Sequence, residues 1–121
     1  MIESELLAEQ AILIVKPHGA LASSDFERIA RQVDPYIERN GTLHGLMIEA
    51  ESFPGWKDFS ALVSHFRFVA DHHRKIEKVA AVSDSAILSI VPAIVDHFVG
   101  AEVRHFDYED RREALVWLTA R

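Results

Sequence analysis

Short apolar runs alternate with longer amphipathic stretches along this chain, and that alternation restricts the folds it can adopt. The clearest runs fall at residues 11–15, 43–50, 79–82 and 102–106. Near-continuous apolar runs of this length are typical of strands that are covered on both faces. The stretches between them are long enough for helices. Strands that alternate with helices favour an α/β sandwich with a mostly parallel sheet.

A weaker apolar run at residues 2–7 precedes the first of these strands. It is expected to pair antiparallel with residues 12–15 through a turn near Glu9 and Gln10. The run at residues 102–106 alternates in polarity, which favours a place at the sheet edge. We therefore expect four or five mostly parallel strands with an antiparallel first strand.

The helical period predicts four main helices, with connections short enough for one domain over residues 1–121. The helices are expected at about residues 24–39, 56–73, 85–99 and from Asp107 onward, where Asp107 is the expected N-cap. Pro35 lies inside the first helix and should kink it or break it into two pieces. Asn40 and Gly41 supply a left-handed stop for that helix. The last helix should bury a stripe of Ala114, Leu115 and Leu118.

Composition narrows the function class. The chain has no cysteine, which excludes a disulfide, a catalytic thiolate and a cysteine-type zinc site. Thirteen basic residues against nineteen acidic ones give a net charge of −6, which disfavours binding to a nucleic-acid backbone. No run approaches the about 18 apolar residues of a transmembrane helix, and the first residues are acidic where a signal peptide is basic. We expect a cytoplasmic protein that is not an integral membrane protein.

The titratable residues form no recognisable catalytic or metal motif. His65 and His72 are seven residues apart, about 10 Å along a helix and too far to share one ion. His73 falls on an apolar stripe and is better explained as a helix-end residue. Glu49 and Glu51 flank the end of a central strand and are expected to be solvated loop residues. We therefore expect no catalytic residue, no metal and no cofactor.

The predicted helix at residues 85–99 is unusually apolar. Its aliphatic and aromatic side chains cover about half of its circumference, and only a narrow strip is polar. Three interpretations stay open. The helix is buried between neighbouring helices, it forms one wall of an apolar pocket, or it packs on another subunit.

Several segments together resemble a known family. The segments are Gly-Trp-Lys-Asp-Phe-Ser-Ala-Leu at 55–62, Phe-Val-Ala-Asp-His-His-Arg-Lys-Ile-Glu-Lys-Val-Ala at 68–80, Val-Ser-Asp at 82–84, Ala-Glu-Val-Arg-His-Phe at 101–106 and Glu-Ala-Leu-Val-Trp-Leu at 113–118. In this order they are similar to the SpoIIAA-like family of small bacterial proteins. That family is related to STAS domains (sulfate transporter and anti-sigma-factor antagonist) and to CRAL-TRIO lipid-binding domains.

The resemblance implies a STAS-like sandwich with a mixed sheet and an antiparallel first strand. Anti-sigma-factor antagonists carry a phosphorylatable serine in an Asp-Ser loop at the start of the helix after the central strand. Ser52 and Ser60 lie in the corresponding region, but neither follows an aspartate. The resemblance therefore does not carry a phosphoserine switch over to this chain.

Two function hypotheses follow. The first is a non-catalytic binding or regulatory module that holds an apolar or lipid-like ligand between the second and third predicted helices. Its lining would be Trp56, Phe59, Val63, Phe66, Ile87, Ile90, Val91 and Ile94. The alternative is a protein-interaction regulator of the anti-sigma-factor-antagonist type, which acts through an apolar surface in a homodimer or with another protein. An enzyme, most plausibly a hydrolase using His and Glu, has no supporting motif.

Overall fold

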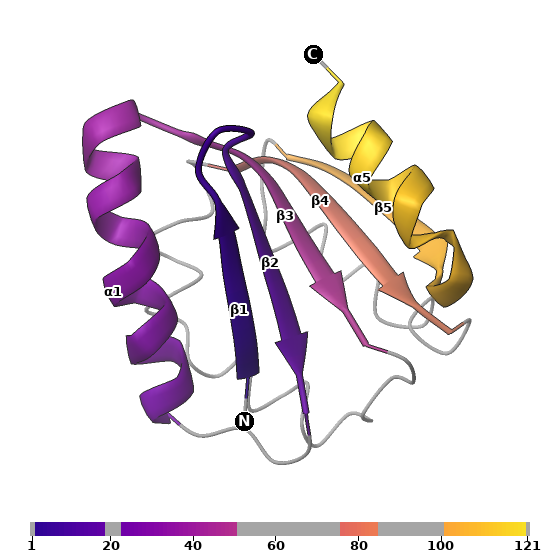
Figure 1. The fold of residues 1–121 in the computed structure, drawn as a ribbon, viewed down its shortest axis with the longest axis horizontal. Coiled ribbons are helices and arrows are strands. Elements are labelled where there is room, and N and C mark those ends of the chain that lie inside the picture. The colour runs from indigo at the N-terminus through magenta and orange to yellow at the C-terminus, as the bar shows by residue number, and fades with distance from the viewer. Residues whose placement is uncertain (1, 19–22, 51–75, 85–100, 121) are drawn as a thin grey trace.

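A computed structural model describes residues 2–18, 23–50, 76–84 and 101–120 of the chain (Figure 1). The strands are β1 (Ile2–Leu7), β2 (Ile12–Pro17), β3 (Leu43–Glu49), β4 (Ile76–Ser83) and β5 (Glu102–Asp107). The helices are α1 (Ser23–Asn40), the short 3₁₀ helix η3 (Tyr108–Asp110) and α5 (Arg111–Thr119). Of the four helices expected, those at 56–73 and 85–99 lie outside the described residues.

The five strands form one sheet in the order β1-β2-β3-β4-β5. β1 runs antiparallel to β2, and β2 to β5 are parallel neighbours. The turn between β1 and β2 is closed by a hydrogen bond from the Gln10 N–H to the Leu7 carbonyl, 3.1 Å long. Both the antiparallel first strand and the edge position of the last strand are thus confirmed.

Helix α1 runs without a break through Pro35. Of the two expected outcomes, a kink or a break into two pieces, the break is wrong, and burial explains why. Ile29 and Val33 before the proline, and Tyr36 and Ile37 after it, are all buried against the sheet. Burying such side chains stabilises by about 1.5–3 kcal/mol each, which offsets the about 3 kcal/mol that a proline costs inside a helix. The helix ends as predicted, with Gly41 at a φ of 85°.

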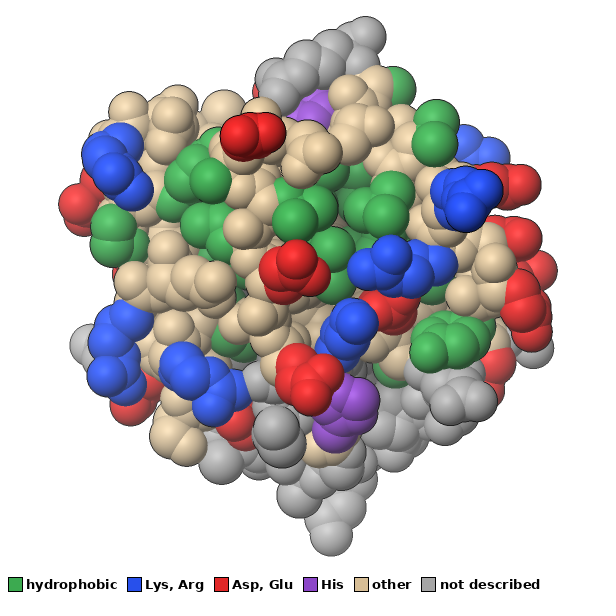
Figure 2. Space-filling model, in the orientation of Figure 1, with side chains coloured by type: hydrophobic (Ala, Val, Ile, Leu, Met, Phe, Trp, Pro, Cys, Tyr) green, Lys and Arg blue, Asp and Glu red, His purple; other side chains and the backbone are tan. Residues whose placement is uncertain are grey.

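Helices pack on both faces of the sheet. On one face α1 covers a buried cluster that includes Leu13, Leu46 and Val79. On the other face α5 contributes Ala114 and Leu118 to a cluster with residues from β2, β3, β4 and β5. The expected two-sided sandwich is therefore confirmed for the described residues. In the view of Figure 2, hydrophobic side chains gather near the middle of the surface and charged side chains surround them.

The start of the last helix differs from the expectation. Asp107 does not cap α5, because it is still part of β5, where it pairs with Ser83. The 3₁₀ helix η3 follows, and α5 begins only at Arg111. The Asp107 side chain makes no capping hydrogen bond to η3. The buried stripe on α5 is as predicted, with Ala114 and Leu118 fully buried and Leu115 partly buried.

Candidate functional site

A buried carboxylate lies at the carboxyl end of the central strand. Glu49 is the last residue of β3 and is only 6% exposed. Lys16, near the end of β2, places its Nζ 3.3 Å from Glu49 Oε2, and Arg111 forms an ion pair with Glu49 Oε1 through its Nε. The expectation that Glu49 is a solvated loop residue is wrong. It belongs to β3 on the face that α5 covers, and two cations compensate its charge. Glu51 lies outside the described residues.

This ion-pair group joins three elements of the fold. Ligands of open α/β sheets commonly bind at the carboxyl ends of the strands, so its position is that of a potential site. Each oxygen of the Glu49 carboxylate already has a cationic partner, however. A carboxylate held in this way is stabilised in its charged form and fixes β2, β3 and the start of α5 to one another. The ion-pair group of Glu49, Lys16 and Arg111 therefore has a structural role, and we call it the clamp.

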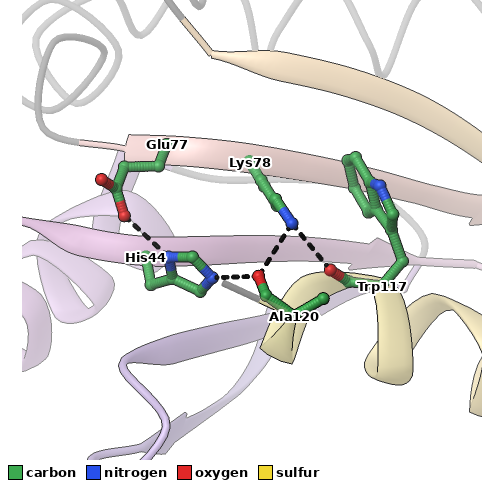
Figure 3. A network of polar contacts seen from close by, with 5 residues as sticks. All are labelled: His44, Glu77, Lys78, Trp117 and Ala120. Atoms are coloured by element: carbon green, nitrogen blue, oxygen red, sulfur yellow. Dashed lines mark hydrogen bonds and ion pairs between the residues drawn. The ribbon is translucent and has the colours of Figure 1, made fainter.

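A second polar group surrounds the end of α5 (Figure 3). Lys78 donates hydrogen bonds to the carbonyls of Trp117 and Ala120, at 3.0 and 2.9 Å. Its Nζ also lies 5.1 Å from the centre of a Trp117 ring. A cation at the last carbonyls of a helix compensates the negative end of the helix dipole. Lys78 therefore fixes the end of α5 to β4.

His44 completes this second group. Its Nδ1 lies 2.7 Å from Glu77 Oε2, and its Nε2 lies 3.1 Å from the Ala120 carbonyl oxygen. Both partners accept hydrogen bonds, so the ring can donate to both only in its doubly protonated form. His44 is 6% exposed, and both of its nitrogens are engaged. The ring therefore acts as a bridge between β3, β4 and the end of α5.

One buried hydroxyl lacks a hydrogen-bond partner among the described residues. Ser83, the last residue of β4, is fully buried, and its Oγ has no partner in the part of the chain that the structure describes. His105 approaches the same residue, but its Nε2 lies 3.2 Å from the Ser83 carbonyl oxygen. The histidine therefore meets the backbone, which is not the arrangement of an activated serine nucleophile.

A hollow among the described residues lies along the β1 edge of the sheet. It is an open groove of about 720 Å³. Its lining comes from β1, β2 and α1 and consists of Glu3, Ser4, Glu5, Ile14, Lys16, Arg28 and Gln32. None of these residues was expected from the sequence to line a site. The available signal was the pair of glutamates at alternate positions of a short first strand, a pattern typical of an edge strand.

The eight predicted ligand-binding residues all lie outside the described residues: Trp56, Phe59, Val63, Phe66, Ile87, Ile90, Val91 and Ile94. The same holds for His65, His72 and His73. Within residues 2–18, 23–50, 76–84 and 101–120, no group of His, Asp and Glu side chains could hold a metal ion. No helix among the described residues is long and apolar enough to cross a membrane.

Comparison with known proteins gives one match. No curated protein and no solved structure matches the chain. The model of the SpoIIAA-like family matches residues 12–119, which include four of the five strands and both described α-helices. A SpoIIAA-like domain favours a STAS-type regulatory module. Because this match spans nearly the whole sequence, the chain belongs to the SpoIIAA-like family.

Proposed function

We propose that the protein is a cytoplasmic, non-catalytic regulatory module of the STAS type that acts by binding another protein. The observation that carries the proposal is the open groove beside β1. Its lining combines two acids, two bases and two uncharged polar residues with a single aliphatic side chain, Ile14. Small-molecule pockets are mostly apolar and enclose their ligand. An open groove whose lining residues are mostly charged or polar is better suited to a segment of a protein partner.

The described polar groups support a non-catalytic role. A general base needs a free lone pair within reach of its substrate. Both oxygens of Glu49 contact cations, and both ring nitrogens of His44 contact acceptors. These side chains hold α5 to the sheet, which is a structural task. Members of STAS-type families generally act by binding, and this agrees with the same interpretation.

Site-specific crosslinking tests the proposal. A photo-crosslinking residue at position 32, on the groove side of α1, is expected to capture a defined partner from an extract of the source cells. The matched control carries the same residue at position 112, which is exposed on α5. Light scattering after size exclusion would show whether the captured species is a second copy. A protein that stays monomeric and crosslinks to nothing from position 32 contradicts the proposal.

A second candidate function is binding of an apolar or lipid-like ligand between the predicted helices at 56–73 and 85–99. The observation that favours it is that apolar side chains cover about half of the circumference of the helix predicted at residues 85–99. The proposed lining keeps the eight residues from Trp56 to Ile94 named above. Native mass spectrometry of freshly purified protein tests it. Absence of any bound mass, together with no thermal shift on adding fatty acids, argues against this function.

The interaction role has a second form, in which an apolar surface mediates a homodimer or a hetero-oligomer. Among the described residues, Val116 and Tyr108 are the exposed large hydrophobic side chains, at 65% and 39%. Scattered apolar side chains are normal on a protein surface, so this observation is weaker than the groove. Val116→Asp leaves the groove unchanged and should abolish self-association only in this second form, as light scattering would show.

A further inference from the structure

Strand β1 has an unpaired edge in the described structure. Among the described strands it pairs with β2 alone. A strand bonded on one side points half of its N–H and C=O groups away from that neighbour. No described backbone hydrogen bond from another element reaches Ile2–Leu6 on that open side. The edge is therefore able to accept one more strand.

The groove described above follows this edge. Glu3, Ser4 and Glu5 of β1 line it together with Arg28 and Gln32 of α1. Figure 1 shows α1 beside β1. A hydrogen bond from Ser4 Oγ to Gln32 Oε1, 2.9 Å long, connects the two elements. An added strand would thus find an open backbone edge within a hollow of suitable size.

The two basic residues of the groove pair with acids that do not line it. Lys16 already pairs with the buried Glu49, and Arg28 pairs with Asp25 at 3.4 Å. Glu3 meets only His18 among the described residues, at 3.3 Å, and this is an ion pair only when the imidazole is protonated. Glu5 is exposed and has no described hydrogen-bond or ion-pair partner. The exposed negative charge of the groove is therefore concentrated on β1, at Glu3 and Glu5, on a chain whose net charge is −6.

We propose that β1 binds an extended basic segment of a partner protein, which adds to the sheet as a sixth strand. The proposal rests on the regulatory binding function proposed above and names the partner's chemistry. Glu3 and Glu5 are two residues apart on one face of β1, which places them about 6.6–6.8 Å apart. A paired strand repeats the same spacing, so Lys or Arg at alternate positions would face them. Strand addition takes affinity from backbone hydrogen bonds and specificity from such alternate side chains.

A second copy of this chain is the less suitable occupant. Two β1 strands that paired across a two-fold axis would bring the glutamates of each copy close to those of the other. Like charges that face each other across strands are destabilising. The same two glutamates therefore disfavour self-pairing and favour a basic partner.

The test uses a fluorescein-labelled Lys-Val-Lys-Val-Lys-Val peptide and measures binding by anisotropy at low salt. We expect binding that weakens as salt rises, because salt screens exposed charges. A peptide with the lysines in one block, and one that is N-methylated at alternate residues, should both bind less well. Amide shift changes in NMR spectra should concentrate in residues 2–7.

The double variant Glu3→Lys/Glu5→Lys should weaken binding by about tenfold or more, since two attractive cross-strand pairs become repulsive. Glu102→Lys is the matched control, because Glu102 is an exposed glutamate on β5 at the opposite edge. It should bind as the wild type does. The milder Glu3→Gln/Glu5→Gln variant should give an intermediate loss and keeps the test valid if the reversed variant folds poorly.

Three results of the peptide experiment overturn the proposal: no binding of the alternating peptide, equal binding by the wild type and the Glu3→Lys/Glu5→Lys variant, or shift changes at β5 instead of β1. Dilution-dependent shift changes in β1 without peptide would identify a second copy as the occupant and would also overturn it. If a photo-crosslinking residue at position 32 still captures a partner in the Glu3→Lys/Glu5→Lys variant, the proposal of a sixth strand fails while the regulatory function stands. If position 32 crosslinks nothing even in the wild type, the proposed function itself fails.

Discussion

Leu118 of α5 packs directly onto Gly45 of β3, so closely that a Cβ on Gly45 would lie 2.9 Å from Leu118 Cδ2. Leu118 is fully buried and has little room to move away. Gly45→Ala should therefore lower the free energy of unfolding by about 1–3 kcal/mol, because the added methyl overpacks the core. Urea denaturation measures this change.

Leu118→Ala provides the matched background for that measurement. Removing the leucine branches leaves space for the new methyl, so the cost of Gly45→Ala should shrink in the double variant. An equal cost in both backgrounds would show that the contact between the two residues is not the cause.

Glu49→Gln should destabilise the protein by about 1–3 kcal/mol, measured by the same denaturation. The amide removes the negative charge that holds Lys16 and Arg111. Breaking a fully buried ion pair costs about 3–5 kcal/mol, but both cations here are about 40% exposed, so solvent reduces the loss. Glu5→Gln changes the same group at an exposed site without a described partner and should leave stability within about 0.5 kcal/mol. Similar losses in both variants would contradict the clamp.

Lys78→Met should cost about 1–3 kcal/mol, because it removes two hydrogen bonds to the last carbonyls of α5 and the contact with the Trp117 ring. Methionine keeps much of the apolar stem. Hydrogen exchange should show faster opening of residues 111–120 than of the sheet. Arg112→Met, at an exposed position of the same helix, is the control and should change neither quantity.

Gly41→Ala should destabilise by about 1 kcal/mol, since Gly41 has a φ of 85° where an L side chain is strained. Its N–H also closes the end of α1 through a 2.7 Å bond to the Ile37 carbonyl. Gly41→Asn should cost less, because asparagine tolerates this conformation better. Thermal unfolding of the three proteins should give midpoint temperatures that fall in the order glycine, asparagine, alanine at position 41.

The strands of the sheet could be predicted because each one is specified by residues that are close together in the sequence. Each strand is a short apolar run, and the first hairpin needs only neighbouring residues. The end of α1 follows in the same way from Asn40 and Gly41. The break at Pro35 was a wrong expectation, because the burial of Val33 and Tyr36, which depends on the sheet, outweighs a local preference.

The polar groups were not predictable, because their members come from distant parts of the chain. Glu49 looks like a loop residue until α5 brings Arg111 onto it. Nothing in the sequence around His44 indicates that its ring meets the Ala120 carbonyl. The groove is also formed by residues far apart in the sequence. Its one sequence signal is the pair of glutamates at alternate positions of β1.

The position of α5 has a consequence for biosynthesis. The strands join the sheet in the order in which the ribosome makes them, each beside the one before. Among the described residues, however, the helix that covers Ile14, Met47 and Val82 is α5, residues 111–119, which is made after every strand. Until residues 111–119 emerge, no described helix covers this apolar face of the nascent sheet, and this interval is when the described strands would depend most on a chaperone.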